Sequence, residues 1–246
     1  MNKLNLDIYF NEKSKKLAIL VDPDRLFDEG KIISFIQKVN ASSIDLILFG
    51  GSLLTTAHFD LTLSKLKANL KKPLIIFPGH HIQISKEADG LLFLSLISGR
   101  NADFLIGQHV VAAPFIKSLG ISVIPTGYIL VDGGKPTTAS YISNTTPIPN
   151  NKPEIAASTA IAGELLGLKL IYLDAGSGAE IPVSEIMISK VKENTTIPLI
   201  VGGGIRDLSF IQKAWNAGAD CVVVGTAIEE NEAFFNELTK LKGGLT

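Results

Sequence analysis

Two short apolar runs near the end of the chain each lead directly into glycine. Residues Pro198 to Gly204 read PLIVGGG, and residues Cys221 to Thr226 read CVVVGT. Such runs are typical of buried parallel strands, and glycine at a strand end lets backbone N–H groups approach a ligand closely. In a (β/α)8 barrel the loops after the last two strands commonly hold phosphate. The two turns therefore predict a barrel fold and a phosphorylated substrate.

Length and composition agree with this fold class, α/β with a (β/α)8 (TIM) barrel. The 246 residues, of which 46% are hydrophobic, suffice for one large core, so a single domain over residues 1–246 is expected. The net charge of −1, with only 19% charged residues, leaves no basic field for nucleic acid. No nucleic-acid partner is expected.

Cysteine usage and the amino terminus predict a cytoplasmic protein without a membrane span. The single cysteine, Cys221, cannot form an internal disulfide, and in its apolar run it is expected to be a small core residue, not a nucleophile. The first sixteen residues mix lysines with acids and lack the apolar stretch of a signal peptide. No apolar stretch is long enough to cross a bilayer.

Eight apolar runs predict the strands. They are Leu17–Val21, Leu46–Phe49, Leu74–Phe77, Leu91–Leu94, Ser122–Pro125, Leu170–Leu173, Leu199–Val201 and Cys221–Val224. The segments between them carry helical apolar spacing: Phe27–Val39, Leu61–Leu70, Asp103–Leu119, Glu154–Leu166, Val183–Lys192, Asp207–Ala217 and Glu232–Leu241. Alternation of this kind predicts a parallel sheet. Gly79–Ala88 is too short for a full helix, so the third helix is expected to be shortened or replaced by a loop, and Asn144–Lys152 is expected to be a long polar loop.

Active sites of such barrels lie at the carboxyl ends of the strands. The residues that follow the expected strands are polar and glycine-rich: Asp22–Arg25, Gly50–Ser52, Pro78–His81, Ser95 with Ser98–Asn101, Thr126–Tyr128 and Asp174–Gly178.

Asp22 is a candidate magnesium ligand, because Mg²⁺ usually takes one or two carboxylates and fills its other positions with water and phosphate oxygens. Ser52, after the neighbouring strand, could add a hydroxyl ligand. The alternative is that Asp22, and more so Asp24, caps a helix.

The segment Tyr172–Ala179, YLDAGSGA, is the most informative single stretch. Side chains alternate along a strand, so Tyr172 and Asp174 face one space. The following glycines and Ser177 can donate hydrogen bonds to a polyol or a phosphate. The structural alternative is a barrel-plugging tyrosine and a helix-capping aspartate.

Other polar residues give weaker indications. Arg100 and Asn101 are candidates for a second phosphate group or for solvated surface. The histidines share no spacing that indicates zinc, and His109 is expected to be structural. The residues alone therefore predict a phosphate-binding barrel without choosing its reaction. A phosphosugar isomerase, epimerase or lyase and a noncatalytic phosphate binder stay open as alternatives, although Lys169 precedes its strand and indicates no Schiff base.

Taken in order, the motifs resemble one family. They are LVDPDR (Leu20–Arg25), FGGS (Phe49–Ser52), FPG (Phe77–Gly79), SGRN (Ser98–Asn101), IGQHVVAAP (Ile106–Pro114), YLDAGSGA, VGGGIR (Val201–Arg206) and VVVGTAIE (Val222–Glu229). The chain resembles geranylgeranylglyceryl phosphate synthases, prenyltransferase barrels related to the PcrB heptaprenylglyceryl phosphate synthases. The glycine segment resembles the AGSGA branch more than PcrB, which favours a geranylgeranyl over a heptaprenyl donor.

The resemblance implies Mg²⁺-dependent transfer of a prenyl chain from its diphosphate to the sn-3 hydroxyl of sn-glycerol 1-phosphate. It implies Asp22 and Ser52 as metal ligands, and Asp174 and Tyr172 as catalytic residues. The implied substrate-binding residues are Tyr172, Leu173, Asp174, Ala175, Gly176, Ser177, Gly178, Gly203, Gly204, Gly225 and Thr226.

One position departs from the family pattern, and two further expectations accompany the resemblance. The family pattern has glutamate where this chain has Asp174, which moves the carboxylate back by about one methylene. An apolar groove is expected along Leu53, Ile82, Ile84 and the fifth strand–helix region. A homo-oligomer, dimer or hexamer, is expected, with Tyr141 as a candidate aromatic anchor.

Overall fold

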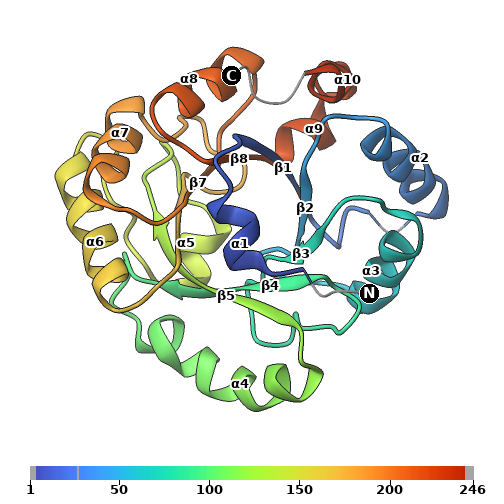
Figure 1. The fold of residues 1–246 in the computed structure, drawn as a ribbon, viewed down its shortest axis with the longest axis horizontal. Helices are drawn as coiled ribbons and strands as arrows, with labels where there is room; N and C mark the ends of the chain where they lie inside the picture. Colours follow the sequence, from blue (N-terminus) through green and yellow to red (C-terminus); the bar gives the residue numbers. More distant parts are fainter. Residues whose placement is uncertain (1–3, 27, 242–246) are drawn as a thin grey trace.

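Eight parallel strands pair in the order of the sequence and close into a barrel (Figure 1). The computed structural model describes residues 4–26 and 28–241. The strands are β1 (Lys16–Val21), β2 (Leu46–Phe49), β3 (Leu74–Ile76), β4 (Gly90–Leu96), β5 (Ser122–Leu130), β6 (Leu170–Asp174), β7 (Leu199–Gly202) and β8 (Cys221–Val224). Closure comes from β1 and β8, where Lys16 is in register with Cys221. The predicted barrel and its eight strands are confirmed.

Helices surround the strands. They are α1 (Leu6–Asn11), α2 (Glu29–Asn40), α3 (Phe59–Asn69), the π-helical turn η1 (Asp103–Gly107), α4 (Gln108–Leu119), α5 (Thr138–Ser143), α6 (Pro153–Leu165), α7 (Glu185–Asn194), α8 (Leu208–Asn216), α9 (Thr226–Glu230) and α10 (Glu232–Lys240). All seven predicted helices are present within a few residues, although Phe27, where the first was expected to begin, lies outside the described residues. As predicted, a loop replaces the helix between β3 and β4.

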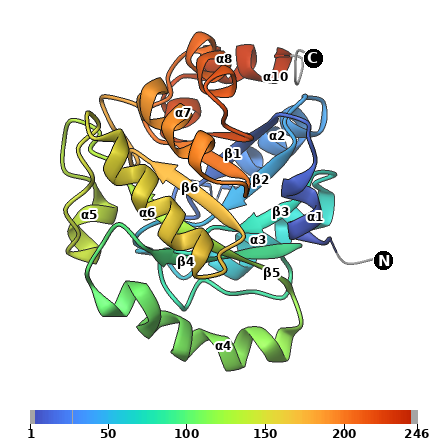
Figure 2. The same cartoon turned by 60° about the vertical axis from the view of Figure 1, so that its left-hand side comes forward.

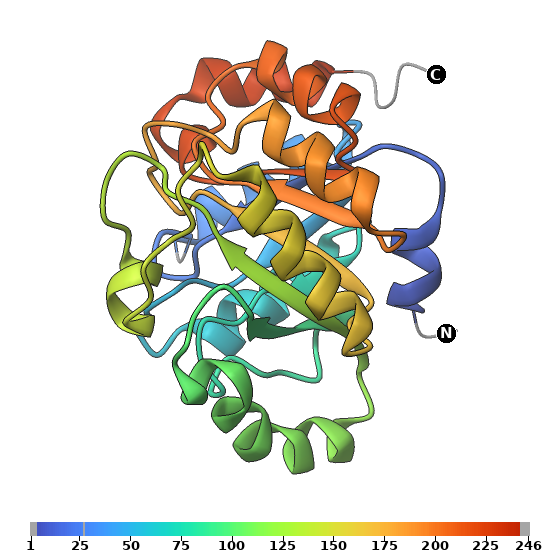
Figure 3. The same cartoon turned by 90° about the vertical axis from the view of Figure 1, so that its left-hand side faces the viewer.

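Three short helices, α1, α5 and α9, were not predicted. Each has only five or six residues, too few to show an apolar period. Helix α1 lies across one end of the barrel, opposite α5 (Figure 3). Its Leu6 and Phe10 are buried against side chains of the barrel interior, such as Leu46 and Leu92. Helix α1 thus closes the amino-terminal end.

Strand β5 is longer than the sequence indicated. Thr126, Gly127 and Tyr128 were expected to follow the strand, but they pair with β4 and β6 inside it. The glycine marks close packing and not a turn, because a Cβ on Gly127 would lie 2.8 Å from Ile97 Cδ1 and 3.0 Å from Ile171 Cδ1. The consequence is functional, since β5 carries Tyr128 into the barrel mouth.

The missing helix after β3 changes one flank of the barrel. Helix α4 lies on the outside beside β4 and β5 (Figure 2), and the loop between Phe77 and Gly90 takes the place that a helix would fill next to it. A pocket lies between β4, this loop and the η1–α4 segment. The alternation of strands and helices is therefore interrupted at the place where this pocket lies.

Candidate active site

Two adjoining pockets lie at the carboxyl ends of the strands. The polar one is lined by residues that follow most of the strands, among them Asp22, Ser52, Asp174, Ser177 and Thr226. The other is lined mainly by apolar side chains of β4, η1 and α4. Both pockets share Gly51, Ser52, Phe77, Tyr128 and Ala139. A molecule with a polar head and an apolar tail can therefore occupy both across this common wall.

The glycine turn after β7 is a tight backbone cradle. Gly203 and Gly204 have φ of 84° and 71°, values that favour glycine. A Cβ on Gly203 would lie 2.7 Å from the backbone nitrogen of Ala175 and equally near Oδ1 of Asp174. The turns after β6 and β8 meet through the hydroxyls of Ser177 and Thr226, 2.9 Å apart. Backbone N–H groups and hydroxyls gathered in this way suit a phosphate.

Asp174, the last residue of β6, lies at the bottom of the polar pocket with 7% of its surface exposed. Its Oδ1 accepts a hydrogen bond of 2.7 Å from Gly176 N, and its Oδ2 accepts one from the phenol of Tyr128. Burial raises the pKa of Asp174, while these two hydrogen bonds act in the opposite direction. A carboxylate with a raised pKa is suited to taking up a proton.

Three aromatic rings form the wall behind Asp174. The rings of Phe77, Tyr128 and Tyr172 lie within 5.1–5.7 Å of one another, centroid to centroid. Burial, with the neighbouring Asp174 carboxylate, raises the pKa of both tyrosines well above the usual value, so each keeps its phenolic proton. A Cβ at Gly202 would lie 2.6 Å from Tyr172 Oη, so glycine at the end of β7 leaves room for this phenol.

Asp22 and Ser52 line the polar pocket from neighbouring strands, β1 and β2. Oδ1 of Asp22 accepts a hydrogen bond of 3.0 Å from Asp24 N, and burial raises the pKa of Asp22. Glu229, paired with Arg25 at 2.7 Å, lines the same side and adds to the negative charge around Asp22. The set consists of hard oxygen donors, which fits Mg²⁺. In the described part of the chain no three His, Cys, Asp or Glu side chains converge on a metal position.

Most of the predicted site residues come together in the polar pocket. Those lining it are Asp22, Ser52, Tyr172, Asp174, Gly176, Ser177, Gly178, Gly203, Gly204, Gly225 and Thr226. Leu173 and Ala175 do not line it. Both belong to the core between the strands and the helices. Leu173 points there because side chains on β6 alternate between the barrel interior and its outside, and Ala175 directly follows the strand.

Other candidates serve the fold. Asp24 does not cap a helix but binds both hydroxyls and both amides of Thr55 and Thr56. Asn101 donates to the carbonyl of Ser143 at 2.8 Å, and Arg100 to that of Gly99 at 2.7 Å; neither lines the two pockets.

The structure adds residues that sequence reasoning missed. Tyr128 was expected to lie in a loop after the fifth strand. Extending the expected strand to Leu130 would have placed its side chain at the barrel mouth. Arg206, two residues after Gly204 in the turn that follows β7, lines the polar pocket and pairs with Glu230 at 3.3 Å. Thr138 and Ala139 line it from the unpredicted α5.

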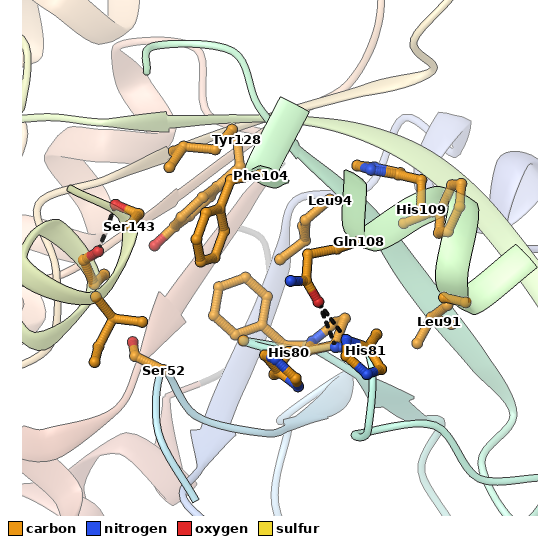
Figure 4. A pocket seen from close by; sticks show the side chains of 18 of the residues that line it. Ser52, His80, His81, Leu91, Leu94, Phe104, Gln108, His109, Tyr128 and Ser143 are labelled. Atoms are coloured by element: carbon orange, nitrogen blue, oxygen red, sulfur yellow. Dashed lines mark hydrogen bonds between the residues drawn. The ribbon is translucent and has the colours of Figure 1, made fainter. Parts of the chain in front are cut away.

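The apolar pocket matches the expected groove in part. Ile84 lines it as predicted, whereas Leu53 lines the polar pocket and Ile82 is 65% exposed and lines neither. As expected, the fifth strand–helix region contributes to the apolar pocket, through Tyr128 and Leu130 of β5 and Ile142 and Ser143 of α5. Its other walls are Leu91, Phe93, Leu94 and Leu96 of β4 and Phe104, Gln108, His109, Ala112 and Ile116 of η1 and α4. Figure 4 shows Ser52 and Ser143 toward one side, His109 and Leu91 toward the other, and His80 beside His81 between them.

His109, expected to be structural, is buried in this wall. Its Nε2 lies 3.0 Å from Ser95 Oγ, and its ring packs edge-on against Phe93. His80 and His81 stack with centroids 4.0 Å apart, and His81 Nδ1 contacts Oε1 of Gln108. Burial and the neighbouring His81 lower the pKa of His80, which favours its neutral form.

Fold and site together define a (β/α)8 barrel whose polar pocket, built on glycine turns, adjoins an apolar groove. The chain belongs to the PcrB family, whose model matches residues 10–242. It is 50% identical over 224 residues to the geranylgeranylglyceryl phosphate synthase of Chitinophaga pinensis, covering 91% of this chain and 88% of that protein. The synthase of the same name from Pyrococcus furiosus is 42% identical over 227 residues, covering 90% and 88%.

Among solved structures, the barrel matches (S)-3-O-geranylgeranylglyceryl phosphate synthase of Thermoplasma acidophilum in complex with its substrate sn-glycerol-1-phosphate. The TM-score is 0.89 at 30% identity, with 97% of this chain and 99% of that chain covered. Among the described residues, no helix is both long and apolar enough to cross a membrane.

Proposed function

We propose that this chain transfers a geranylgeranyl group from its diphosphate to the sn-3 hydroxyl of sn-glycerol 1-phosphate in a Mg²⁺-dependent reaction. The observation that carries the proposal is the wall of Phe77 and Tyr128, shared by a phosphate-type pocket and an apolar groove, with the Asp174 carboxylate beside it. Relatives named as geranylgeranylglyceryl phosphate synthases support it. The chain is an enzyme of the prenyltransferase class.

The acceptor fits the polar pocket. The glycine turns at Gly203 and Gly225, with the hydroxyls of Ser177 and Thr226, would hold the phosphate. Asp174 and Tyr172 would then face the glycerol hydroxyls, because both line the pocket from β6. A relative in complex with sn-glycerol-1-phosphate supports this acceptor.

The donor fits the apolar groove, with its diphosphate toward Ser52 at the junction. The walls from β4 and α4 offer branched and aromatic side chains, which suit an isoprenoid tail because burying apolar surface stabilises binding by about 25 cal/mol per Å². This orientation directs the reactive end of the chain to the shared wall, next to the acceptor hydroxyl.

Asp22 and Ser52 would hold the magnesium ion. When bound, Mg²⁺ neutralises charge that develops on the leaving diphosphate. Asp174 orients the acceptor hydroxyl and takes its proton as the new C–O bond forms and the allylic C–O bond to diphosphate breaks. Tyr128 stabilises the ionised form of Asp174 before this transfer.

The alternatives fit less well. Among the described residues lining the polar pocket none is lysine or histidine, so a Schiff-base lyase has no amine there. A heptaprenyl donor is the second candidate, because the matched family carries the PcrB description.

We also infer that the protein is a homo-oligomer and lies in the cytoplasm. Tyr141, on α5, is 84% exposed, which is unusual for a ring of this size and supports its role as an anchor between subunits of a dimer or hexamer. A buried, unpaired Cys221 supports a cytoplasmic location.

Extraction of a lipid product tests the function. Purified protein is incubated with radiolabelled sn-glycerol 1-phosphate, Mg²⁺ and C15, C20 or C35 prenyl diphosphate. We expect radioactivity in the organic phase, most with the C20 donor and none after chelation of Mg²⁺. No extractable product with any donor would reject prenyl transfer.

A further inference from the structure

One buried amide links the two loops that meet beside the candidate metal site. Gln83 lies in the loop after β3, and none of its surface is exposed. Its Nε2 donates to the carbonyl of Gly51 at 2.8 Å, and its Oε1 accepts from the N–H groups of Gly51 and Gly79, each at 3.3 Å. The side chain thus pairs with both polar groups of Gly51, much as a neighbouring strand would.

The two loops pack backbone against backbone at this point. A Cβ on Gly79 would lie 2.3 Å from the carbonyl oxygen of Gly51 and 2.7 Å from Cα of Ser52. A Cβ on Gly50, whose φ is 154°, would lie 2.0 Å from the carbonyl oxygen of Phe77. Glycines permit the approach, and Gln83 supplies directional hydrogen bonds that hold it in one register.

The position of Gly51 connects this amide to the metal site. Gly51 directly precedes Ser52, and a Cβ on Gly51 would lie only 3.5 Å from Oδ1 of Asp22. Gln83 itself lines neither pocket, so it can act only through the loop that it holds. We propose that Gln83 is a positioning residue that fixes the Ser52 hydroxyl opposite Asp22, an assignment that rests on the proposed function.

The loop that stands in place of a helix after β3 has the path that this role needs. A helix directly after β3 would carry its side chains along the outside of the barrel, whereas the observed loop turns inward and brings Gln83 beneath the end of β2. A turn in which Gln83 N donates to the carbonyl of His80 at 3.0 Å sets this direction. The same loop therefore opens the apolar groove and steadies the metal ligand.

The test compares Gln83→Met with the wild type. Methionine keeps the length of the side chain and removes its hydrogen bonds. Ser85→Ala is the control, because Ser85 is a buried polar residue of the same loop whose hydroxyl bonds Glu87 N and not Gly51. Melting temperatures verify folding. If Gln83→Met does not fold, Gln83→Leu replaces it, since leucine also removes the hydrogen bonds to Gly51 and Gly79 and adds no charge near Asp22.

Three readouts separate positioning from general loosening. In Gln83→Met, amide hydrogen exchange over residues 50–53 is expected to speed up at least tenfold without metal or substrate. The Mg²⁺ concentration for half-maximal activity is expected to rise at least tenfold. The Kd for sn-glycerol 1-phosphate without Mg²⁺ is expected to stay within twofold, because the glycine turns after β6, β7 and β8 do not touch Gln83. Ser85→Ala should match the wild type in all three.

Unchanged exchange over residues 50–53 in the folded variant would overturn the assignment, and so would an unchanged Mg²⁺ response. A wild type without any Mg²⁺-dependent prenyl transfer would instead reject the proposed function. The exchange experiment would then still show whether Gln83 holds the Ser52 loop, so the two failures are distinguishable.

Discussion

Tyr128 of β5 donates its phenolic hydrogen to Oδ2 of Asp174 of β6, across a gap of 46 residues in sequence. The two strands are adjacent and parallel, with Leu130 in register with Asp174. The hydrogen bond therefore spans two positions of the ladder. It ties the aromatic wall between the pockets to the carboxylate that we propose as proton acceptor.

Removing this hydrogen bond should change the pH dependence of the reaction. The bond from Tyr128 favours the ionised form of Asp174, so Tyr128→Phe should raise the pKa of Asp174 further. The acid limb of the profile of kcat/KM against pH should move to higher pH, with a loss of about tenfold on that limb. Tyr141→Phe, at an exposed ring, should leave the profile unchanged. An unshifted acid limb in Tyr128→Phe would separate Asp174 from the proton transfer.

Asp22→Asn should abolish most activity and leave the fold intact. The amide loses the charge that attracts Mg²⁺, so we expect kcat to fall roughly 100-fold. Each factor of ten in kcat corresponds to about 1.36 kcal/mol of the activation barrier. Turnover across a magnesium titration measures the effect. Asp24→Asn is the control, because that carboxylate binds Thr55 and Thr56 instead. Equal magnesium curves for Asp22→Asn and wild type would remove Asp22 from the metal site.

The enzyme should prefer sn-glycerol 1-phosphate to its 3-phosphate enantiomer. With the phosphate fixed at the glycine turns and the hydroxyls at Asp174 and Tyr172, only one enantiomer places its terminal hydroxyl at the prenyl carbon. A lost buried hydrogen bond costs about 1 to 3 kcal/mol, or roughly ten- to more than a hundredfold in kcat/KM. Equal use of the two enantiomers would reject this arrangement of the site.

A bulky residue in the apolar groove should shorten the accepted donor. Ala112 of α4 is buried and lines the groove, so Ala112→Phe should reduce kcat/KM for the C20 diphosphate about tenfold, and for the C15 diphosphate less. Ala113→Phe makes the same change at the next residue of α4, which is exposed, and should have little effect. If both donors lose activity equally in Ala112→Phe, the tail does not lie along α4.

Light scattering at micromolar protein should give the mass of a dimer or a hexamer of the 26.3 kDa chain. Tyr141→Asp should lower it, because a charge at the centre of an interface must lose its hydration when the subunits associate. A mass of one chain for the wild type would contradict the proposed oligomer, and an unchanged mass for the variant would move the interface away from Tyr141.

The barrel and the phosphate-type pocket could be predicted from the sequence because their signals are local. Each apolar run followed by glycine is complete within about seven residues, as at Pro198 to Gly204, and a closed parallel barrel places the carboxyl ends of all its strands on one face. The absence of a helix between β3 and β4 could also be predicted, since the ten residues Gly79–Ala88 cannot hold a helix with its two connections.

The tertiary structure decided which neighbours these local signals acquire. Whether Gly127 ends a strand or packs within one depends on Ile97 and Ile171, which no short window contains. The apolar groove arises from β4 and α4 facing one another across a missing helix, and Gln83 reads as an ordinary loop residue until its amide meets Gly51, 32 positions away. Periodicity and glycine report backbone geometry within a segment, whereas a buried hydrogen bond exists only when the folded chain brings its donor and acceptor together.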